Sequence, residues 1–244
     1  MAGKTGGAGK GAAVLVRPSG GPAYEAKHLE VLKAAASLFA RHGYHDASLR
    51  ELSRKTGRSL SGLYHYFTGK EELLYQIQHH CYTGLLSSVR KFLDDAGTPH
   101  EKVVYFISHH IAYFRRQMDE MKVLAHEDLT LSGEYGKGIL ELKREYSQLL
   151  IDIVADYATS VVPRPRRPPA EVAAFVLFGM MNWLYTWPKS LRNLPPELLA
   201  EHIAQIFLCG FPGCPGTTLA TVRDSLLCAP QRAFWKRRSN SRDE

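Results

Sequence analysis

The segment from Ser48 to Lys70 carries helix-start and helix-stop signals only a few residues apart, and these signals limit what it can fold into. Ser48 opens the sequence Ser-Leu-Arg-Glu, a capping box in which the serine caps a helix and the glutamate three residues later reaches back to the cap. Gly57 supplies a stop signal, because glycine readily takes the left-handed conformation at a helix end. Ser59 is a second N-cap. The spacing predicts two short helices joined by a tight turn.

Apolar residues give each of these short helices an inner face. Leu49 and Leu52 face inward from the first helix, and Leu63 and Phe67 from the second. A third helix begins at Lys70, where two following glutamates suit the positive end of the helix dipole. This is the layout of a helix-turn-helix, whose second helix lies in the major groove of DNA. From the pattern alone, three ordinary helices with a polar surface remain an alternative.

Helical periodicity also runs through the rest of the chain. Long helices are expected from Lys70 to about Phe92 and from Tyr135 to Ser160. No stretch alternates convincingly as a strand, so we predict an all-α chain with an N-terminal three-helix helix-turn-helix DNA-binding domain and a C-terminal helical ligand-binding and dimerisation bundle. The expected divisions are a disordered basic leader (1–22), the DNA-binding domain (23–70), the ligand-binding and dimerisation domain (71–211) and an irregular basic tail (212–244) with a short helix at 220–227.

Charge and composition narrow the class of protein. The 244 residues carry a formal net charge of +7, which favours an anionic partner such as nucleic acid or an acidic ligand. Residues 1–22 are either a solvated leader or a basic arm that contacts DNA. The sequence holds no long apolar run and no secretory signal, so we expect a cytoplasmic protein without membrane contact. The cysteines and histidine pairs lack metal-ligand spacing, so neither a metal site nor a cofactor is expected.

The residues from Glu25 to Leu74 resemble the DNA-binding domain of the TetR-type transcriptional repressors. The likeness runs through Leu38-Phe39-Ala40, Gly43-Tyr44, Ser48 to Leu52, Leu63 to Phe67 and Lys70 to Leu74. It implies that the chain forms a homodimer that binds a palindromic operator in double-stranded DNA. It also implies that a ligand bound to the C-terminal bundle reorients the two DNA-binding domains.

Carried over by motif position, the resemblance implies phosphate contacts by Ser48 and Lys70 and backbone or base contacts by Tyr64 and His65. The candidate DNA-binding residues are Ser48, Arg50, Arg58, Ser59, Leu60, Ser61, Tyr64, His65 and Lys70. Arg58 departs from the family pattern, which usually has a small apolar residue there; it is either an extra phosphate clamp or a solvated turn charge. Leu60 also departs from the pattern and is able to pack on a thymine methyl group.

The strongly apolar stretch from Ala170 to Trp187 predicts a helix buried on nearly every side, with one side toward a sister subunit and the other toward a cavity. We expect dimerisation through this helix and the helix predicted over 196–211. Aromatic residues on preceding helices are further candidates to line the cavity, although each is alternatively a plain core residue. The candidate ligand-binding residues are Tyr82, Phe106, His110, Tyr113, Phe114, Tyr146, Phe178, Trp183 and Trp187.

The stretch from Met180 to Trp187, with Glu127-Asp128-Leu129 and Leu140 to Tyr146, further resembles family members that sense acyl-CoA thioesters of fatty-acid or sterol breakdown. An acyl chain needs an apolar tunnel, and the phosphates of coenzyme A need Arg or Lys near its mouth. The candidates for that charge, each alternatively a solvated surface cation, are Arg115, Arg116, Lys143, Arg144, Lys189 and Arg192.

These observations predict a transcriptional repressor that an acyl-CoA or a similar apolar acidic effector releases from a palindromic operator. A TetR-type regulator of drug-like or other hydrophobic ligands is the alternative, and a helical enzyme acting on acyl substrates is a third hypothesis. No Ser-His-Asp or Cys-His spacing signals a nucleophile and base, so we do not expect an enzyme. With about four phosphate contacts per subunit, log affinity should fall against log salt with a slope of roughly −7.

Overall fold

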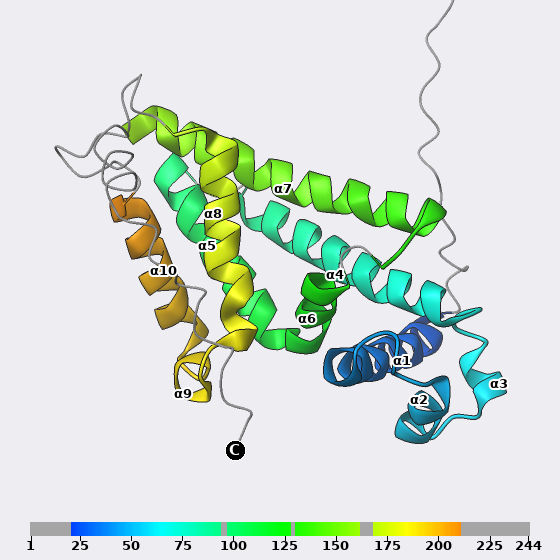
Figure 1. Ribbon diagram of the computed structural model, residues 1–244. Coiled ribbons are helices and arrows are strands. Elements are labelled where there is room, and N and C mark those ends of the chain that lie inside the picture. The colour runs from blue at the N-terminus through cyan, green and yellow to red at the C-terminus, as the bar shows by residue number, and fades with distance from the viewer. Residues whose placement is uncertain (1–20, 94–96, 128–129, 162–167, 211–244) are drawn as a thin grey trace, which may run out of the picture.

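The computed structural model describes residues 21–93, 97–127, 130–161 and 168–210, and all regular structure in these ranges is helical (Figure 1). The all-α prediction is therefore confirmed. The elements are α1 (Gly21–His42), α2 (Leu49–Thr56), α3 (Leu60–Leu63), α4 (Lys70–Leu93), α5 (Pro99–Arg116), α6 (Met118–His126), α7 (Gly133–Val161), α8 (Ala170–Asn182), the 3-10 helix η1 (Trp183–Thr186), α9 (Lys189–Arg192) and α10 (Pro196–Gly210).

The predicted N-terminal leader and C-terminal tail lie almost wholly outside these ranges. The structure corrects one boundary, because α1 begins at Gly21, inside the predicted leader. The rest of that leader, the basic tail and the helix predicted at 220–227 are not among the described residues. The division of the remaining chain at residue 70 stays a prediction.

Side-chain caps form the short helices much as the sequence predicts. The Ser48 Oγ accepts a hydrogen bond from the Glu51 amide at 3.1 Å, and the Ser59 Oγ accepts one from the Gly62 amide at 3.1 Å. Gly57 ends α2 with a φ of 65°, a conformation that favours glycine. The capping box is only half formed, because a Glu51 carboxylate oxygen lies 3.4 Å from His42 Nε2 instead of reaching the cap.

One hydrophobic cluster joins the first helices. The predicted inward residues Leu52, Leu63 and Phe67 are at most 2% exposed. This N-terminal cluster extends into the first turns of α4 and includes Val123 of α6. The DNA-binding helices are therefore packed directly against part of the following bundle.

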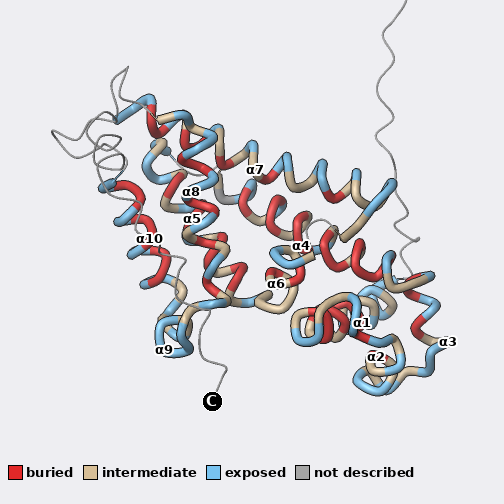
Figure 2. The backbone as a smooth tube through the Cα atoms, in the orientation of Figure 1, coloured by how far each residue is buried: buried red, intermediate tan, exposed pale blue. Residues whose placement is uncertain are grey.

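A second hydrophobic cluster fills the bundle formed by α4, α5, α7, α8 and α10. α5 lies at its centre and packs on α4, α7 and α10, while α7 packs on α4 and α8. Figure 1 shows α4 running from the N-terminal helices into this bundle. Buried positions follow the inward sides of these helices, and exposed positions follow the outer sides (Figure 2).

The apolar stretch from Ala170 to Trp187 differs from its prediction in two ways. The α-helix ends at Asn182, and the chain tightens into η1 before it reaches Pro188, which precedes α9. One side of α8 is also open in the single chain, since Val172 and Val176 are each 56% exposed. The helix is thus buried on one side, not on nearly every side.

Candidate DNA-binding surface and internal cavity

The turn before α3 and its first residues form an exposed polar surface. Ser59 and Ser61 are exposed, and their hydroxyl oxygens lie 3.0 Å apart. Leu60 and Tyr64 are also open, at 37% and 47% exposure. Because a hydroxyl that accepts a capping bond still has a hydrogen to donate, the capping serines remain able to bind phosphate oxygens. Ser48, Arg50 and His65 are exposed as well, so these predicted DNA-contacting residues are accessible.

The recognition helix is shorter than the motif suggests. α3 spans only Leu60–Leu63, Tyr64 is its C-terminal cap and His65 lies in the following turn. The sequence predicts that the second short helix extends to Phe67 and carries Tyr64 and His65, and this extension is wrong. The hydroxyl of Tyr24 donates to the His65 carbonyl at 3.3 Å, which fixes this turn against α1.

Arg58 lies against the protein and not free in solvent. Its guanidinium is 5.5 Å from the centre of the Tyr66 ring and 3.7 Å from a Glu30 carboxylate oxygen. The exposed ion pair with Glu30 contributes little, but the ring contact orients the side chain. Arg58 is thus held at the start of the helix-turn-helix turn, next to the exposed serines.

Lys70 joins the start of α4 to the turn between α1 and α2. Its ammonium donates to the His45 carbonyl at 2.8 Å and sits 4.8 Å from the centre of the Tyr44 ring. Burial lowers its pKa from the usual value. An ammonium has three N–H donors, so two remain for a phosphate oxygen.

A cavity of about 270 Å³ lies inside the bundle. Its walls are mainly aromatic and aliphatic, with a few polar groups, which is the usual composition of a small-molecule site. The lining residues are Tyr82, Leu85, His110, Phe114, Met121, Leu124, Ala125, Lys143, Tyr146, Ser147, Phe175, Phe178 and Asn182. They come from α4, α5, α6, α7 and α8, so no single stretch of sequence contains the site.

The structure brings five of the nine candidate ligand-binding residues to this cavity: Tyr82, His110, Phe114, Tyr146 and Phe178. Phe106 is fully buried behind them, in ring contact with His110, Tyr146 and Phe178. Lys143 is the one predicted phosphate-binding cation that lines it.

Three aromatic candidates lie elsewhere. Tyr113 packs where α4 and α5 approach closely at Gly84, and its hydroxyl donates to the Cys81 carbonyl at 3.2 Å. Trp183 is 60% exposed on the outer surface, because it continues the helical spacing of the exposed Val172 and Val176. Trp187 packs at the edge of the bundle cluster and does not line the cavity.

A buried histidine gives the cavity a polar centre. His110 is 1% exposed; its Nδ1 lies 2.9 Å from the Tyr146 hydroxyl and its Nε2 lies 3.0 Å from the Asn182 Oδ1. Burial lowers the pKa of His110 to about 4, so the ring is neutral near pH 7. Sequence reasoning missed Asn182, although an amide within an otherwise apolar stretch was the available signal.

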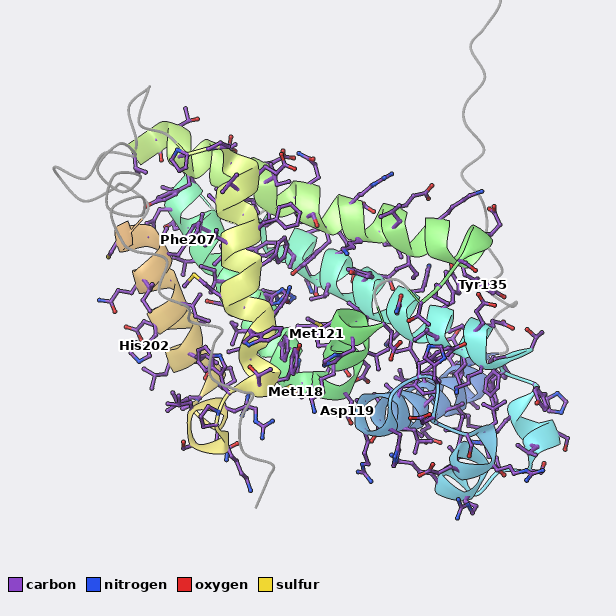
Figure 3. All side chains as sticks on the ribbon, in the orientation of Figure 1. Met118, Asp119, Met121, Tyr135, His202 and Phe207 are labelled. Atoms are coloured by element: carbon purple, nitrogen blue, oxygen red, sulfur yellow. The ribbon has the colours of Figure 1, made fainter. Side chains whose placement is uncertain are left out.

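Helix α6 connects the cavity to the DNA-binding helices. Met121 lines the cavity, whereas Val123, two residues later, is buried in the N-terminal cluster. Figure 3 shows Met121 where α6 meets the bundle. Directly after α6, the Glu127 carboxylate accepts a hydrogen bond from the Tyr44 amide at 3.1 Å, and its carbonyl accepts one from Gln78 at 3.0 Å. A change at the cavity wall thus has a short packed route to the turn that holds Lys70.

The outer sides of α8 and α10 expose apolar side chains. On α8 these include Val172, Phe175 and Val176, and on α10 Ile206 is 65% exposed. Figure 3 shows His202 on the outward side of α10, while Phe207 of the same helix lies toward the bundle. Large exposed apolar patches are common at protein interfaces. No helix among the described residues is long and apolar enough to cross a membrane.

Both halves of the chain match known protein families. Residues 31–77 match the family described as bacterial regulatory proteins, tetR family, and residues 96–211 match the tetracyclin repressor-like C-terminal domain. The transcriptional repressor KstR2 of Mycolicibacterium smegmatis is 30% identical over 182 residues, which cover 73% of this chain and 85% of that protein. The fatty acid metabolism regulator protein of Bacillus subtilis is 21% identical over 186 residues, or 75% and 95% of the two chains.

Solved structures agree with this assignment. The structure of AibR in complex with isovaleryl coenzyme A and operator DNA is 27% identical, with a TM-score of 0.67, and the match covers 77% of this chain and all of that one. A TetR-family regulator from Bordetella parapertussis is 28% identical, with a TM-score of 0.70 and coverage of 77% and 97%. This chain belongs to the TetR family of transcriptional regulators, which bind DNA and are not enzymes.

Proposed function

We propose that the protein is a homodimeric repressor that leaves a palindromic operator when an acyl-CoA thioester binds in the bundle cavity. The observation that carries this proposal is the cavity itself, which is mainly apolar and is connected through α6 to the DNA-binding helices. A regulator that binds operator DNA works in the cytoplasm.

The size and lining of the cavity favour an acyl group. A volume of 270 Å³ holds about nine water-sized groups at roughly 30 Å³ each, so it suits a short or branched acyl chain. The rest of a coenzyme A molecule would stay outside, where Lys143 in the lining is suited to meet an anionic group. The similarity to AibR, solved with isovaleryl coenzyme A, and to a fatty acid metabolism regulator supports the same ligand class.

Release of DNA would follow from movement of α6. A ligand that pushes on Met121 shifts the helix that also carries Val123 and leads to Glu127. Because Glu127 holds the Tyr44 amide, the shift is passed to the turn between α1 and α2. The ligand acts only if it binds the shifted state more tightly than the DNA-binding state.

Dimerisation would use the exposed apolar sides of α8 and α10, paired with the same surfaces of a second copy. A two-fold interface is self-complementary, so one patch per chain is sufficient. The dimer would place two copies of the surface around Ser59, Ser61 and Tyr64 on the two halves of a palindrome.

The decisive experiment measures operator release. The operator is located by footprinting, and its affinity is measured by fluorescence anisotropy with isovaleryl-CoA, octanoyl-CoA, free coenzyme A and an aromatic cationic drug. We expect the acyl-CoA thioesters to weaken operator binding by at least about tenfold, within the usual range of allosteric coupling. Release by the drug alone would instead support the alternative, a regulator of drug-like ligands, which the aromatic walls also suit. A footprint without two-fold symmetry would contradict the dimeric arrangement.

A further inference from the structure

Three polar side chains from three helices meet in the apolar cavity. His110 of α5 lies between Tyr146 of α7 and Asn182 at the end of α8, at 2.9 Å and 3.0 Å. Around the imidazole lie the rings of Phe106, Phe114 and Phe178. Buried polar groups in such surroundings are costly unless each is paired, so their arrangement is tightly constrained.

The hydrogen-bonding partners determine which nitrogen of His110 carries the proton. The Asn182 Oδ1 can only accept, so the Nε2 of His110 must donate to it. The neutral ring then leaves Nδ1 as an acceptor, and the Tyr146 hydroxyl must donate to it. The chain of donors therefore runs from Tyr146 through His110 to Asn182.

The same placement of Oδ1 turns the amide nitrogen of Asn182 away from His110. With its oxygen held by His110, its nitrogen has no hydrogen-bond partner within the described parts of the chain, yet Asn182 lines the cavity. An amide nitrogen carries two N–H donors and no acceptor. The cavity thus offers a fixed donor in mainly apolar walls, which calls for a ligand oxygen that accepts.

We infer that Asn182 recognises the carbonyl oxygen of the acyl group, with Tyr146 and His110 acting as positioning residues that hold its amide in the donating orientation. The inference rests on the proposed function and adds which chemical group of the ligand the cavity recognises, the thioester carbonyl. A thioester provides the oxygen acceptor, and its hydrocarbon chain packs on the aromatic walls. A thioether of the same length fills the same space but offers no oxygen to the amide.

The test compares each thioester with its matched thioether by isothermal titration calorimetry on the full chain. The pairs are isovaleryl-CoA with S-isopentyl-CoA, and octanoyl-CoA with S-octyl-CoA. For the pair that binds more tightly, we expect the thioester to be favoured by about fivefold, since the net free energy of a single neutral hydrogen bond corresponds to about that ratio. Equal affinities would overturn the inference and leave the proposed function standing. Failure of both thioesters to bind would overturn both.

Asn182→Asp gives the matching variant. The carboxylate still accepts the proton of His110 Nε2, but the two N–H donors are lost. The ratio of thioester to thioether affinity should fall to about one, whereas Asn193→Asp, the same change at an exposed position after α9, should keep the wild-type ratio. Tyr146→Phe should also lower the ratio, because it frees His110 to take the other tautomer. An unchanged affinity ratio in Asn182→Asp would contradict the inference. If that variant does not fold, the ratio of thioester to thioether affinity in the wild type tests the inference by itself.

Discussion

The DNA-binding helices and the bundle around the cavity use their polar side chains in opposite ways. In the first, the serines at 48 and 59 are exposed, bond to amides three residues away and keep a hydrogen to donate. In the second, His110 is fully enclosed, and its partners lie 36 and 72 residues away along the chain. The first arrangement is local and remains open to a large polyanion. The second is long-range, closed and suited to a small, mostly apolar ligand.

Because of this difference, substitutions in the two regions should have different effects. The DNA-binding surface depends on local caps and on the presence of a second copy, so its failures should appear as small losses of stability or as weaker DNA binding. The bundle depends on a buried, neutral imidazole, so its failures should appear as lost stability or lost response to ligand.

Val176→Arg should give the largest change. Val176 is 56% exposed on the proposed interface, and an arginine there would place like charges across a two-fold axis. Loss of the dimer removes the linkage between two half-sites, so operator affinity should fall by roughly 10³-fold. Sedimentation and anisotropy measure the two effects. Gln148→Arg on the exposed side of α7 adds the same charge and should leave both unchanged. A Val176→Arg dimer with normal operator affinity would show that the interface lies elsewhere.

Acid should destabilise the bundle through His110. Its pKa is about 4 in the folded chain and near 6.5 when unfolded, so the unfolded state binds more protons between these values. Stability is therefore complete above about pH 6.5 and falls as pH drops toward 4, with a loss on the order of 3 kcal/mol from this group. His79, His80 and His109, whose pKa values are also lowered by desolvation, add a loss of the same sign.

Urea unfolding between pH 4 and 8 measures this dependence. His110→Gln should give a clearly flatter profile than the wild type. His202→Gln, at an exposed position of α10, should follow the wild-type curve. Parallel profiles for wild type and His110→Gln would mean that His110 is not held neutral by its surroundings.

Glu127→Ala should weaken the link between the two regions. It removes the acceptor of the Tyr44 amide, so the acyl-CoA should change operator affinity by about 1 kcal/mol less than in the wild type. Thr130→Ala removes only the hydroxyl that donates to Glu127 at 2.7 Å, and serves as the matched control. Anisotropy titrations with and without isovaleryl-CoA give the coupling. If Glu127→Ala and Thr130→Ala behave alike, the bond to Tyr44 carries no coupling.

Ser48→Ala should have the smallest effect and leave the bundle untouched. Loss of the N-cap of α2 typically costs about 1 kcal/mol of stability. Ser61→Ala, which removes an exposed hydroxyl that caps no helix, should cost at most about 0.5 kcal/mol. Thermal unfolding compares the two. A loss from Ser61→Ala equal to that from Ser48→Ala would argue against the cap as the cause.

Much of the DNA-binding region was predictable because its signals are local. The capping serines and the glycine after α2 define the short helices within a few residues of sequence, and the structure places them as expected. The short α3 was not predictable from periodicity, since four residues are barely one turn. The contact of the Arg58 guanidinium with the Tyr66 ring was not predictable either, because no local sequence pattern indicates it.

The sequence alone determined the all-α fold, the helix-turn-helix and the family, because caps, stops and apolar periodicity act between neighbours along the chain. The tertiary structure alone decided which aromatic residues reach the cavity, that Trp183 faces outward, and that Asn182 completes the buried polar group. Those outcomes depend on the rotation and end point of α8 and on packing among helices far apart in sequence. No short segment carries that information, because the partners of His110 meet it only once the bundle has assembled.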